Sequence, residues 1–122
     1  MKILGISSNY HDASASLVID GKVVASSAEE RFTLQKHDPS FPHFSIDFCL
    51  KQAKIKPHDI DLVVYHEDPI NKITRTMSSS FIKFPFSLKT FIKSAKEMIS
   101  TGFWVKSEIC KKLNISPKKV IF

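Results

Sequence analysis

Two polar segments near the N-terminus carry residue types that can bind phosphate and move protons. The first, residues 7–14 (SSNYHDAS), surrounds His11 and Asp12 with small polar side chains. Backbone N–H groups in a tight polar hairpin can surround phosphate oxygens, and histidine carries protons near neutral pH. The alternative is a plain turn in which Asn9 and Asp12 cap their own backbone. The candidate binding residues of this segment are Ser7, Asn9, His11, Asp12 and Ser14.

The second segment, residues 29–38 (EERFTLQKHD), holds six charged or titratable groups within ten residues. Arg31 and Lys36 could clamp an anionic ligand, because a guanidinium binds oxygens in pairs and an ammonium acts as a point charge. His37 is a further candidate for the same ligand, although exposure to solvent explains it equally well. The alternative is a loop of mutually neutralising surface salt bridges, each worth at most about 1 kcal/mol.

The remaining histidines and the cysteines predict no metal site in this chain. His43, His58 and His66 are isolated, and no pair has metal-ligand spacing. Cys49 is expected in the core, and neither cysteine belongs to a CxxC motif. This cysteine usage fits a reducing compartment, and no signal peptide or long apolar span is evident, so we expect a cytoplasmic protein.

A sheet must position these segments. Apolar and alternating patterns predict strands at 2–7, 14–20 and 22–27, and Asp20-Gly21 between the last two is a strong hairpin signal. We therefore expect a three-stranded antiparallel meander. Residues 28–43 have no clean period and are expected to leave the sheet as an irregular excursion.

The pattern then changes to helices and further strands. A helix over 44–54 is expected, with Ser45 as its cap and an apolar face of Ile46, Cys49, Leu50 and Ala53. A buried strand at 61–66 should lie beside the meander after this crossover. Further helices are predicted around 88–99 and 105–113, and 120–122 reads as the start of another strand.

The charge of the chain is uneven along its 122 residues. Residues 1–61 hold seven basic and eight acidic groups, whereas residues 62–122 hold eleven and four. Such an excess could attract nucleic acid or anionic lipid, but it equally describes a lysine-rich solvated helix face. We expect no nucleic-acid partner because no such motif accompanies the charge. Membrane association is not expected either, since helices that cover a sheet need the same apolar stripes.

Several ordered motifs resemble the start of the O-carbamoyltransferase family, which includes nodulation-factor and antibiotic carbamoyltransferases. The resemblance begins at residues 3–7 (ILGIS) and 11–15 (HDASA) and continues through 29–33 (EERFT) and 36–38 (KHD). It covers residues 3 to about 69. Shorter matches at Asp20-Gly21, Phe41-Pro42, Cys49-Leu50, 59–61 and 63–65 support it, and 118–122 resembles a later strand of the family.

The resemblance implies an α/β fold, the first half of an actin-like ATPase (ribonuclease H-like) domain with the order β-β-β-α-β-α-α-β. It divides the chain into a sheet core at 1–69, a basic helical insertion at 70–117 and the start of the next strand at 118–122. It also implies that ATP and carbamoyl phosphate give carbamoyl-adenylate in a separate C-terminal domain. The actin-like domain then passes the carbamoyl group to the hydroxyl of a small molecule.

By the same resemblance, His11 falls on the motif histidine and is our candidate catalytic base or electrostatic partner. Arg31, Lys36 and His37 fall on motif positions and are candidates for binding the nucleotide or carbamoyl group. A divalent metal is expected in the whole protein, with its ligands beyond Phe122. The chain is therefore interpreted as a fragment that is inactive alone, and an exposed strand at its end could pair it into a homodimer.

One departure from the family pattern and two rival functions stay open. Lys54 stands where the family usually has glycine after the helix, so a left-handed stop would cost about 1 kcal/mol and the helix is expected to end differently. A sugar kinase of the same fold group would place an Asp-x-Gly hairpin where this chain has His11-Asp12. A free-standing nucleotide-binding or scaffold module without catalysis is the nonenzymatic alternative.

Overall fold

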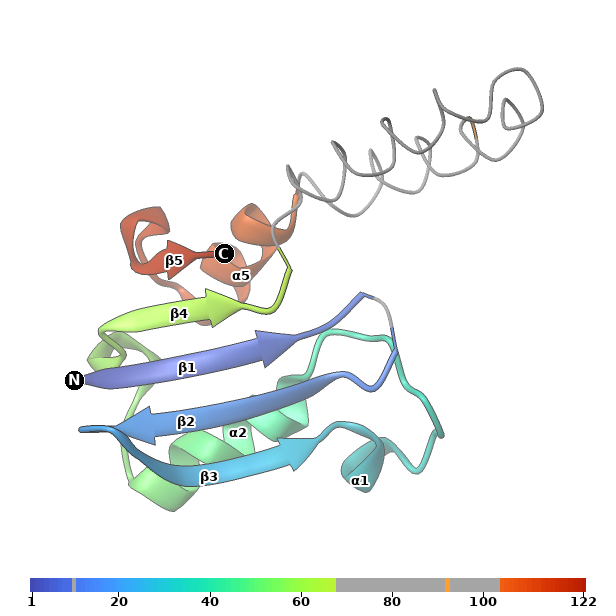
Figure 1. The fold of residues 1–122 in the computed structure, drawn as a ribbon, viewed down its shortest axis with the longest axis horizontal. Helices are drawn as coiled ribbons and strands as arrows, with labels where there is room; N and C mark the ends of the chain where they lie inside the picture. Colours follow the sequence, from blue (N-terminus) through green and yellow to red (C-terminus); the bar gives the residue numbers. More distant parts are fainter. Residues whose placement is uncertain (10, 68–91, 93–103) are drawn as a thin grey trace.

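The computed structural model describes residues 1–9, 11–67, 92 and 104–122, and a mixed five-stranded sheet forms its centre (Figure 1). The strand order is β3-β2-β1-β4-β5. The first three strands are antiparallel, whereas β4 runs parallel to β1 and β5 parallel to β4. The strands are β1 (Lys2–Ser7), β2 (Ser14–Ile19), β3 (Lys22–Ala28), β4 (Leu62–Tyr65) and β5 (Val120–Ile121).

The predicted meander is confirmed, and its second turn forms by local chemistry. Asp20 and Gly21 have φ angles of 49° and 80°, which a two-residue hairpin turn of this kind requires. The N-terminal ammonium of Met1 pairs with the Asp20 carboxylate at the same edge. The register places Ser7 opposite Ser14 at the other end of the β1–β2 pair.

Helices connect and cover the strands. Helix α2 (His43–Ala53) packs on β2 and β3, and α5 (Val105–Leu113) packs beside β5. One core cluster joins buried residues of both helices, such as Cys49 and Ile109, to Leu4, Leu17 and Val63 of the sheet. The short elements are α1 (Glu30–Thr33) and the 3₁₀-helices η1 (Pro57–Asp59) and η2 (Pro117–Lys119).

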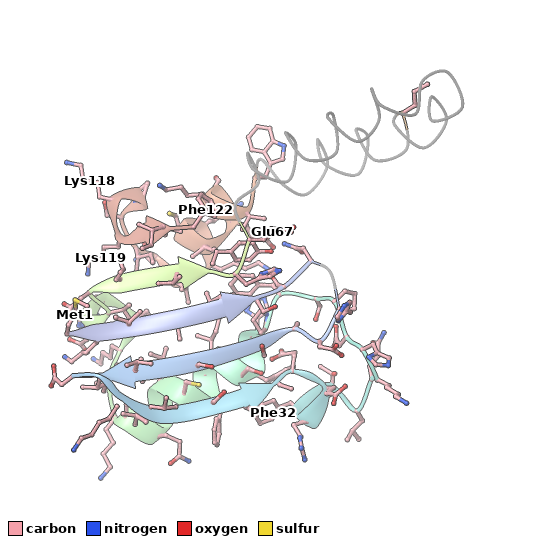
Figure 2. The ribbon with its side chains drawn as sticks, in the orientation of Figure 1. Met1, Phe32, Glu67, Lys118, Lys119 and Phe122 are labelled. Carbon is pink, nitrogen blue, oxygen red and sulfur yellow. The ribbon has the colours of Figure 1, made fainter. Side chains whose placement is uncertain are left out.

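The two faces of the sheet differ in burial. In β1 the alternate residues Leu4 and Ile6 are buried, and in β2 so are Ala15 and Leu17, while the other residues of both strands are half-buried. This alternation is what a period of two produces when one face carries the core. Figure 2 shows Glu67 and Phe122 where β4 and β5 end, and Phe32 beyond β3 at the opposite edge.

Three expectations need correction. Residues 30–33 form the short helix α1 instead of an irregular excursion. Ser45 is not the cap of α2; Pro42 holds that position, and Ser45 is buried inside the first turn. Lys54 does adopt the left-handed conformation, with a φ of 54°, because its N–H and that of Ile55 satisfy carbonyls at the helix end.

The expected helix around residues 88–99, and with it most of the insertion assigned to 70–117, lies outside the described residues. The mixed α/β class is confirmed for the part of the chain that is described. Within that part, no helix is long and apolar enough to cross a membrane.

Candidate functional site

A carboxylate between two imidazoles forms the centre of the candidate site. His11 Nδ1 lies 2.6 Å from Asp12 Oδ2, and His37 Nδ1 lies 2.8 Å from Asp12 Oδ1. All three side chains are at least half exposed. The structure thus brings together three predicted site residues that lie up to 26 positions apart, and we call them the His–Asp–His cluster.

The electrostatics of the cluster favour an ionised carboxylate. The hydrogen bonds from His37 and then His11 hold the pKa of Asp12 below its ordinary value. The hydrogen bond to Asp12 raises the pKa of His37. An ionised Asp12 only accepts hydrogen bonds, so each ring is oriented with its Nδ1–H toward it.

Backbone hydrogen bonds hold the link between β1 and β2 against the loop that carries His37. The N–H groups of Asn9 and Ala13 donate to the carbonyls of Pro39 and Asp38, at 2.8 and 2.9 Å. Asn9 and Asp12 both have positive φ angles, as short polar side chains tolerate. The Asp12 carboxylate therefore forms hydrogen bonds with two histidines from different segments. No described hydrogen bond uses that carboxylate to cap its own backbone.

The same link is fastened to β4 from inside the molecule. The Tyr65 hydroxyl is buried and donates to the Ser8 carbonyl at 2.6 Å. The Ser8 hydroxyl is also buried, and it has no hydrogen-bond partner in the described part of the chain. Burial of both residues fixes where the link leaves the sheet.

Glu29 has a structural role that its charged motif does not reveal. Its carboxylate is 1% exposed and accepts hydrogen bonds from the backbone N–H of Phe44 and from both the N–H and the hydroxyl of Ser45. A carboxylate at this position also complements the positive end of the α2 dipole. Because its partners follow 15 and 16 residues later, spacing along the chain gives no signal of this contact.

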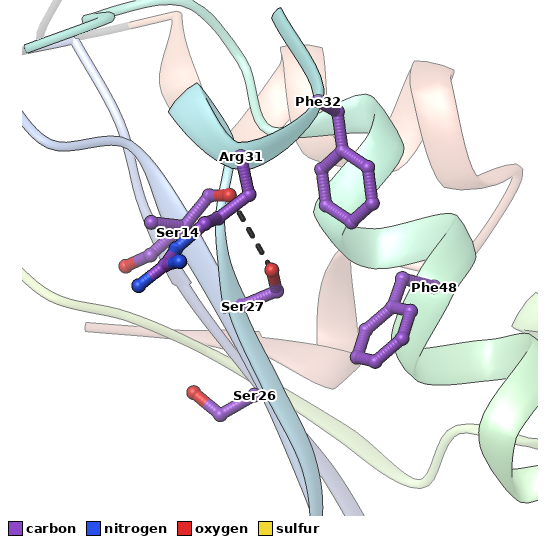
Figure 3. A pocket seen from close by; sticks show the side chains of 7 residues that line it. Ser14, Ser26, Ser27, Arg31, Phe32 and Phe48 are labelled. Carbon is purple, nitrogen blue, oxygen red and sulfur yellow. Dashed lines mark hydrogen bonds between the residues drawn. The ribbon is translucent and has the colours of Figure 1, made fainter. Parts of the chain in front are cut away.

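The remaining candidate residues lie around the cluster or in a neighbouring pocket. Ser14 and Arg31 line one pocket, which lies where β2 begins and β3 ends (Figure 3). Lys36 is exposed next to His37, and Ser7 is the last residue of β1. Neither Arg31 nor Lys36 forms an ion pair with any described carboxylate, which differs from the alternative of a self-neutralising loop.

Sequence reasoning also missed a contact between the two main helices. Lys112 Nζ of α5 lies 4.3 Å from the centre of the Phe41 ring and 3.1 Å from His43 Nε2. Glu108 accepts from the same ammonium at 3.0 Å. The described residues contain no group of three side chains that could hold a metal ion.

Together these features define a mixed α/β protein with a His–Asp–His cluster where an antiparallel hairpin meets the loop before α2. The family described as "Carbamoyltransferase N-terminus" matches residues 2–119. The chain belongs to this family. The match thus also includes residues 70–117, for which the sequence motifs gave no resemblance.

The chain is also similar to several individual proteins. The chain is 39% identical over 111 residues, 91% of its length, to the uncharacterized protein sll1178 of Synechocystis, of which it spans 18%. It is 43% identical over 56 residues, 46% of its length, to the nodulation protein NolNO of Sinorhizobium fredii, of which it spans 8%. An uncharacterized protein of Methanocaldococcus jannaschii, MJ1051, is 41% identical over 61 residues, covering 50% of the chain and 11% of the relative. The chain thus corresponds to a small part of these relatives.

Proposed function

We propose that the chain forms part of a carbamoyltransferase that passes a carbamoyl group from carbamoyl-adenylate to the hydroxyl of a small molecule. ATP and carbamoyl phosphate would supply the adenylate. The observation that carries this proposal is the His–Asp–His cluster, which lies inside the segment that the carbamoyltransferase family matches. The sheet order supports the further proposal of an actin-like, ribonuclease H-like domain, since an antiparallel meander is continued by parallel strands on the β1 side.

In this proposal His11 acts as the base. Asp12 holds the His11 ring by Nδ1, which leaves Nε2 as the basic nitrogen of the neutral ring. His11 takes the proton of the acceptor hydroxyl as its oxygen bonds to the carbamoyl carbon. The bond between that carbon and the phosphate oxygen breaks, and AMP leaves with the electron pair.

The charged residues nearby would stabilise the donor. Lys36 stands beside His37 without an ion-pair partner in the described part of the chain, so its ammonium is available to a phosphate or carbonyl oxygen. Asn9, Ser7 and Ser14 surround the hairpin and are proposed to contact the nucleotide or the carbamoyl group. Protonated His37 would add positive charge on the same side.

The whole protein would supply the remaining parts. A divalent metal would polarise donor oxygens in such a reaction, but the described residues do not form a site for one. We therefore propose that its ligands, and the domain that forms the adenylate, lie elsewhere in the whole protein. The isolated chain is expected to give no turnover, and a cytoplasmic location fits the supply of ATP.

The test uses the complete protein with ATP, carbamoyl phosphate and a panel of hydroxyl acceptors, with carbamoylated product followed by mass spectrometry. His11→Ala is expected to slow transfer by about 10²- to 10⁴-fold while leaving carbamoyl-adenylate formation unchanged. His58→Ala, an exposed histidine outside the cluster, should change neither step. Unchanged transfer in His11→Ala would exclude the role of His11. Nucleotide binding without any carbamoylated product would favour the nonenzymatic module instead.

A further inference from the structure

The pocket beside the cluster has a composition suited to one chemical class of ligand. It has a volume of about 620 Å³ and opens between the ends of β2 and β3, α1 and α2. Hydroxyl groups, one guanidinium and two aromatic rings line it, from Ser14, Ser26, Ser27, Arg31, Phe32 and Phe48 (Figure 3). No described carboxylate lines it, so an anion meets no like charge from the described wall.

Arg31 gives the pocket its charge. Its side chain extends across the pocket toward Ser14 in Figure 3. No carboxylate in the described ranges forms an ion pair with it. Glu29 and Glu30, which precede it in the chain, accept hydrogen bonds from Ser45 and from the N–H of His37 instead. A guanidinium without a partner presents paired donors that match the oxygens of a phosphate or carboxylate.

The opposite wall is aromatic. The ring centres of Phe32 and Phe48 are 5.9 Å apart, and the rings are tilted by 46°. The centre of the Phe44 ring lies 6.3 Å from that of Phe32. Phe32 is 41% exposed, so its ring is offered to the outside instead of closing the core. A flat aromatic ligand would bury apolar area against these rings, in an offset-stacked or edge-to-face arrangement.

The hydroxyl groups lie between these two walls. Ser26 shares a hydrogen bond of 2.9 Å with Ser16, and Ser27 donates to the Ala28 carbonyl at 3.4 Å. Serine hydroxyls rotate and can donate to an anion or accept from a ligand hydroxyl. Ser14 also lies two residues after Asp12, which connects the pocket directly to the hairpin of the cluster.

We propose that this pocket binds an organic anion, a phosphate or carboxylate on a flat aromatic body, as the recognised end of the acceptor. Arg31 binds the anionic group, the serines bind its oxygens, and Phe32 and Phe48 cover the ring. The assignment to the acceptor rests on the proposed function. Binding of the anion itself does not depend on it.

The experiment titrates this chain with phenyl phosphate and with phenylacetate, the two sources of the anionic group. Aromatic signals of Phe32 and Phe48 and the guanidinium signal of Arg31 report binding by NMR. Arg31→Gln should weaken binding by about tenfold or more, as loss of a charge-assisted pair implies. Phe48→Leu should weaken phenyl phosphate but leave inorganic phosphate unchanged. Lys51→Gln on α2 is the matched control for net charge and should bind like the original chain.

Each outcome decides the proposal. Equal affinity of Arg31→Gln with a native-like amide spectrum, or shifts confined to Lys36 and His37, would overturn it. Equal affinity for phenyl phosphate and inorganic phosphate would also overturn it, because the rings would then contribute nothing. In the complete protein, Arg31→Gln should raise KM for an anionic acceptor. Failure of His11→Ala to slow transfer would remove the proposed function but not the NMR result.

Discussion

The two connections of the meander both join antiparallel strands, but different interactions hold them in place. The turn between β2 and β3 has two residues, Asp20 and Gly21, whose own conformations close the hairpin. The link between β1 and β2 also joins antiparallel strands, but it spans residues 8–13. It donates hydrogen bonds to the carbonyls of Asp38 and Pro39 and accepts one from the Tyr65 hydroxyl. The first connection is locally determined, whereas the second depends on segments that are distant in the sequence.

This difference explains why the polar chemistry lies at one end of the sheet. A two-residue turn has no spare backbone groups or side chains for a ligand. A longer link can hold His11 and Asp12 outward, provided that other segments supply the order that its own residues lack. The loop that carries His37 accepts hydrogen bonds that hold the link in place, and it also provides one histidine of the His–Asp–His cluster.

Glu29→Ala should break the distant support most strongly. Three donors at the start of α2, two of them buried, would lose their acceptor, and we expect a loss of about 3 kcal/mol in the free energy of unfolding. Urea denaturation of both proteins measures it. Asp47→Asn on the exposed side of α2 is the control, expected within about 0.5 kcal/mol. Equal stability of the two variants would show that the Glu29 anchor is dispensable.

Tyr65→Phe should loosen the link itself. The Ser8 carbonyl would lose its buried donor, at a cost of about 1–2 kcal/mol, and amides of the link should exchange faster with solvent. Hydrogen exchange followed by NMR measures the exchange rates of these amides and, from the most protected amides, the loss of stability. Ser16→Ala removes an exposed hydroxyl pair instead and should cost only about 0.5 kcal/mol. Exchange that accelerated equally in both variants would contradict a specific role for Tyr65.

Gly21→Ala should test the local turn. The added Cβ meets no atom within 4 Å, so its cost is conformational, about 1 kcal/mol for a φ of 80°. Gly5→Ala is the matched control, because its Cβ would make only an ordinary contact of 3.8 Å with the Ser16 carbonyl oxygen. Thermal unfolding should rank Gly21→Ala below Gly5→Ala. The reverse order would mean that backbone conformation does not limit this turn.

The pairing of Asp12 with His37 should give the smallest effect, and a pH-dependent one. The pKa of His37 is raised above 6.5, so its stabilising contribution is complete below that pH and lost as the pH rises through the raised value. The pKa of Asp12 is lowered from 3.8, so its contribution is present above that pH and lost as the pH falls through the lowered value. Unfolding measured across this range should show the dependence, and His37→Gln should flatten its alkaline side. A His58→Gln control should retain it, and an unchanged profile in His37→Gln would contradict the ion pair.

Local patterns predicted much of the fold because they act within a few residues. The strands β1 to β4 and the helices α2 and α5 follow from alternating or helical apolar spacing, and their observed limits lie within about two residues of those expected. The end of α5 at Asn114, in a left-handed conformation, follows from the same local rules. The short helix α1 was missed because four residues are too few for a period to appear.

The candidate site was predictable only as two separate groups of residues. The types and spacing of residues 7–14 and 29–38 indicated proton transfer and anion binding, and the family motifs added the carbamoyl chemistry. Nothing in either segment indicated that Asp12 would bind His37, or that Glu29 would be buried while its neighbour Arg31 stays available. Ser45 shows the same limit, because a local rule predicts it as the helix cap. In the structure it is buried and donates a hydrogen bond to the distant Glu29 carboxylate.

The sequence by itself determined the elements, the Asp20-Gly21 turn and the membership in the carbamoyltransferase N-terminus family, since these depend on neighbouring residues or ordered motifs. Only the tertiary structure decided which carboxylate became an anchor and which became the centre of the cluster. The physical reason is burial. Glu29 is enclosed with donors from α2 that need an acceptor, whereas Asp12 remains at the surface, where water can replace either histidine as its hydrogen-bond partner.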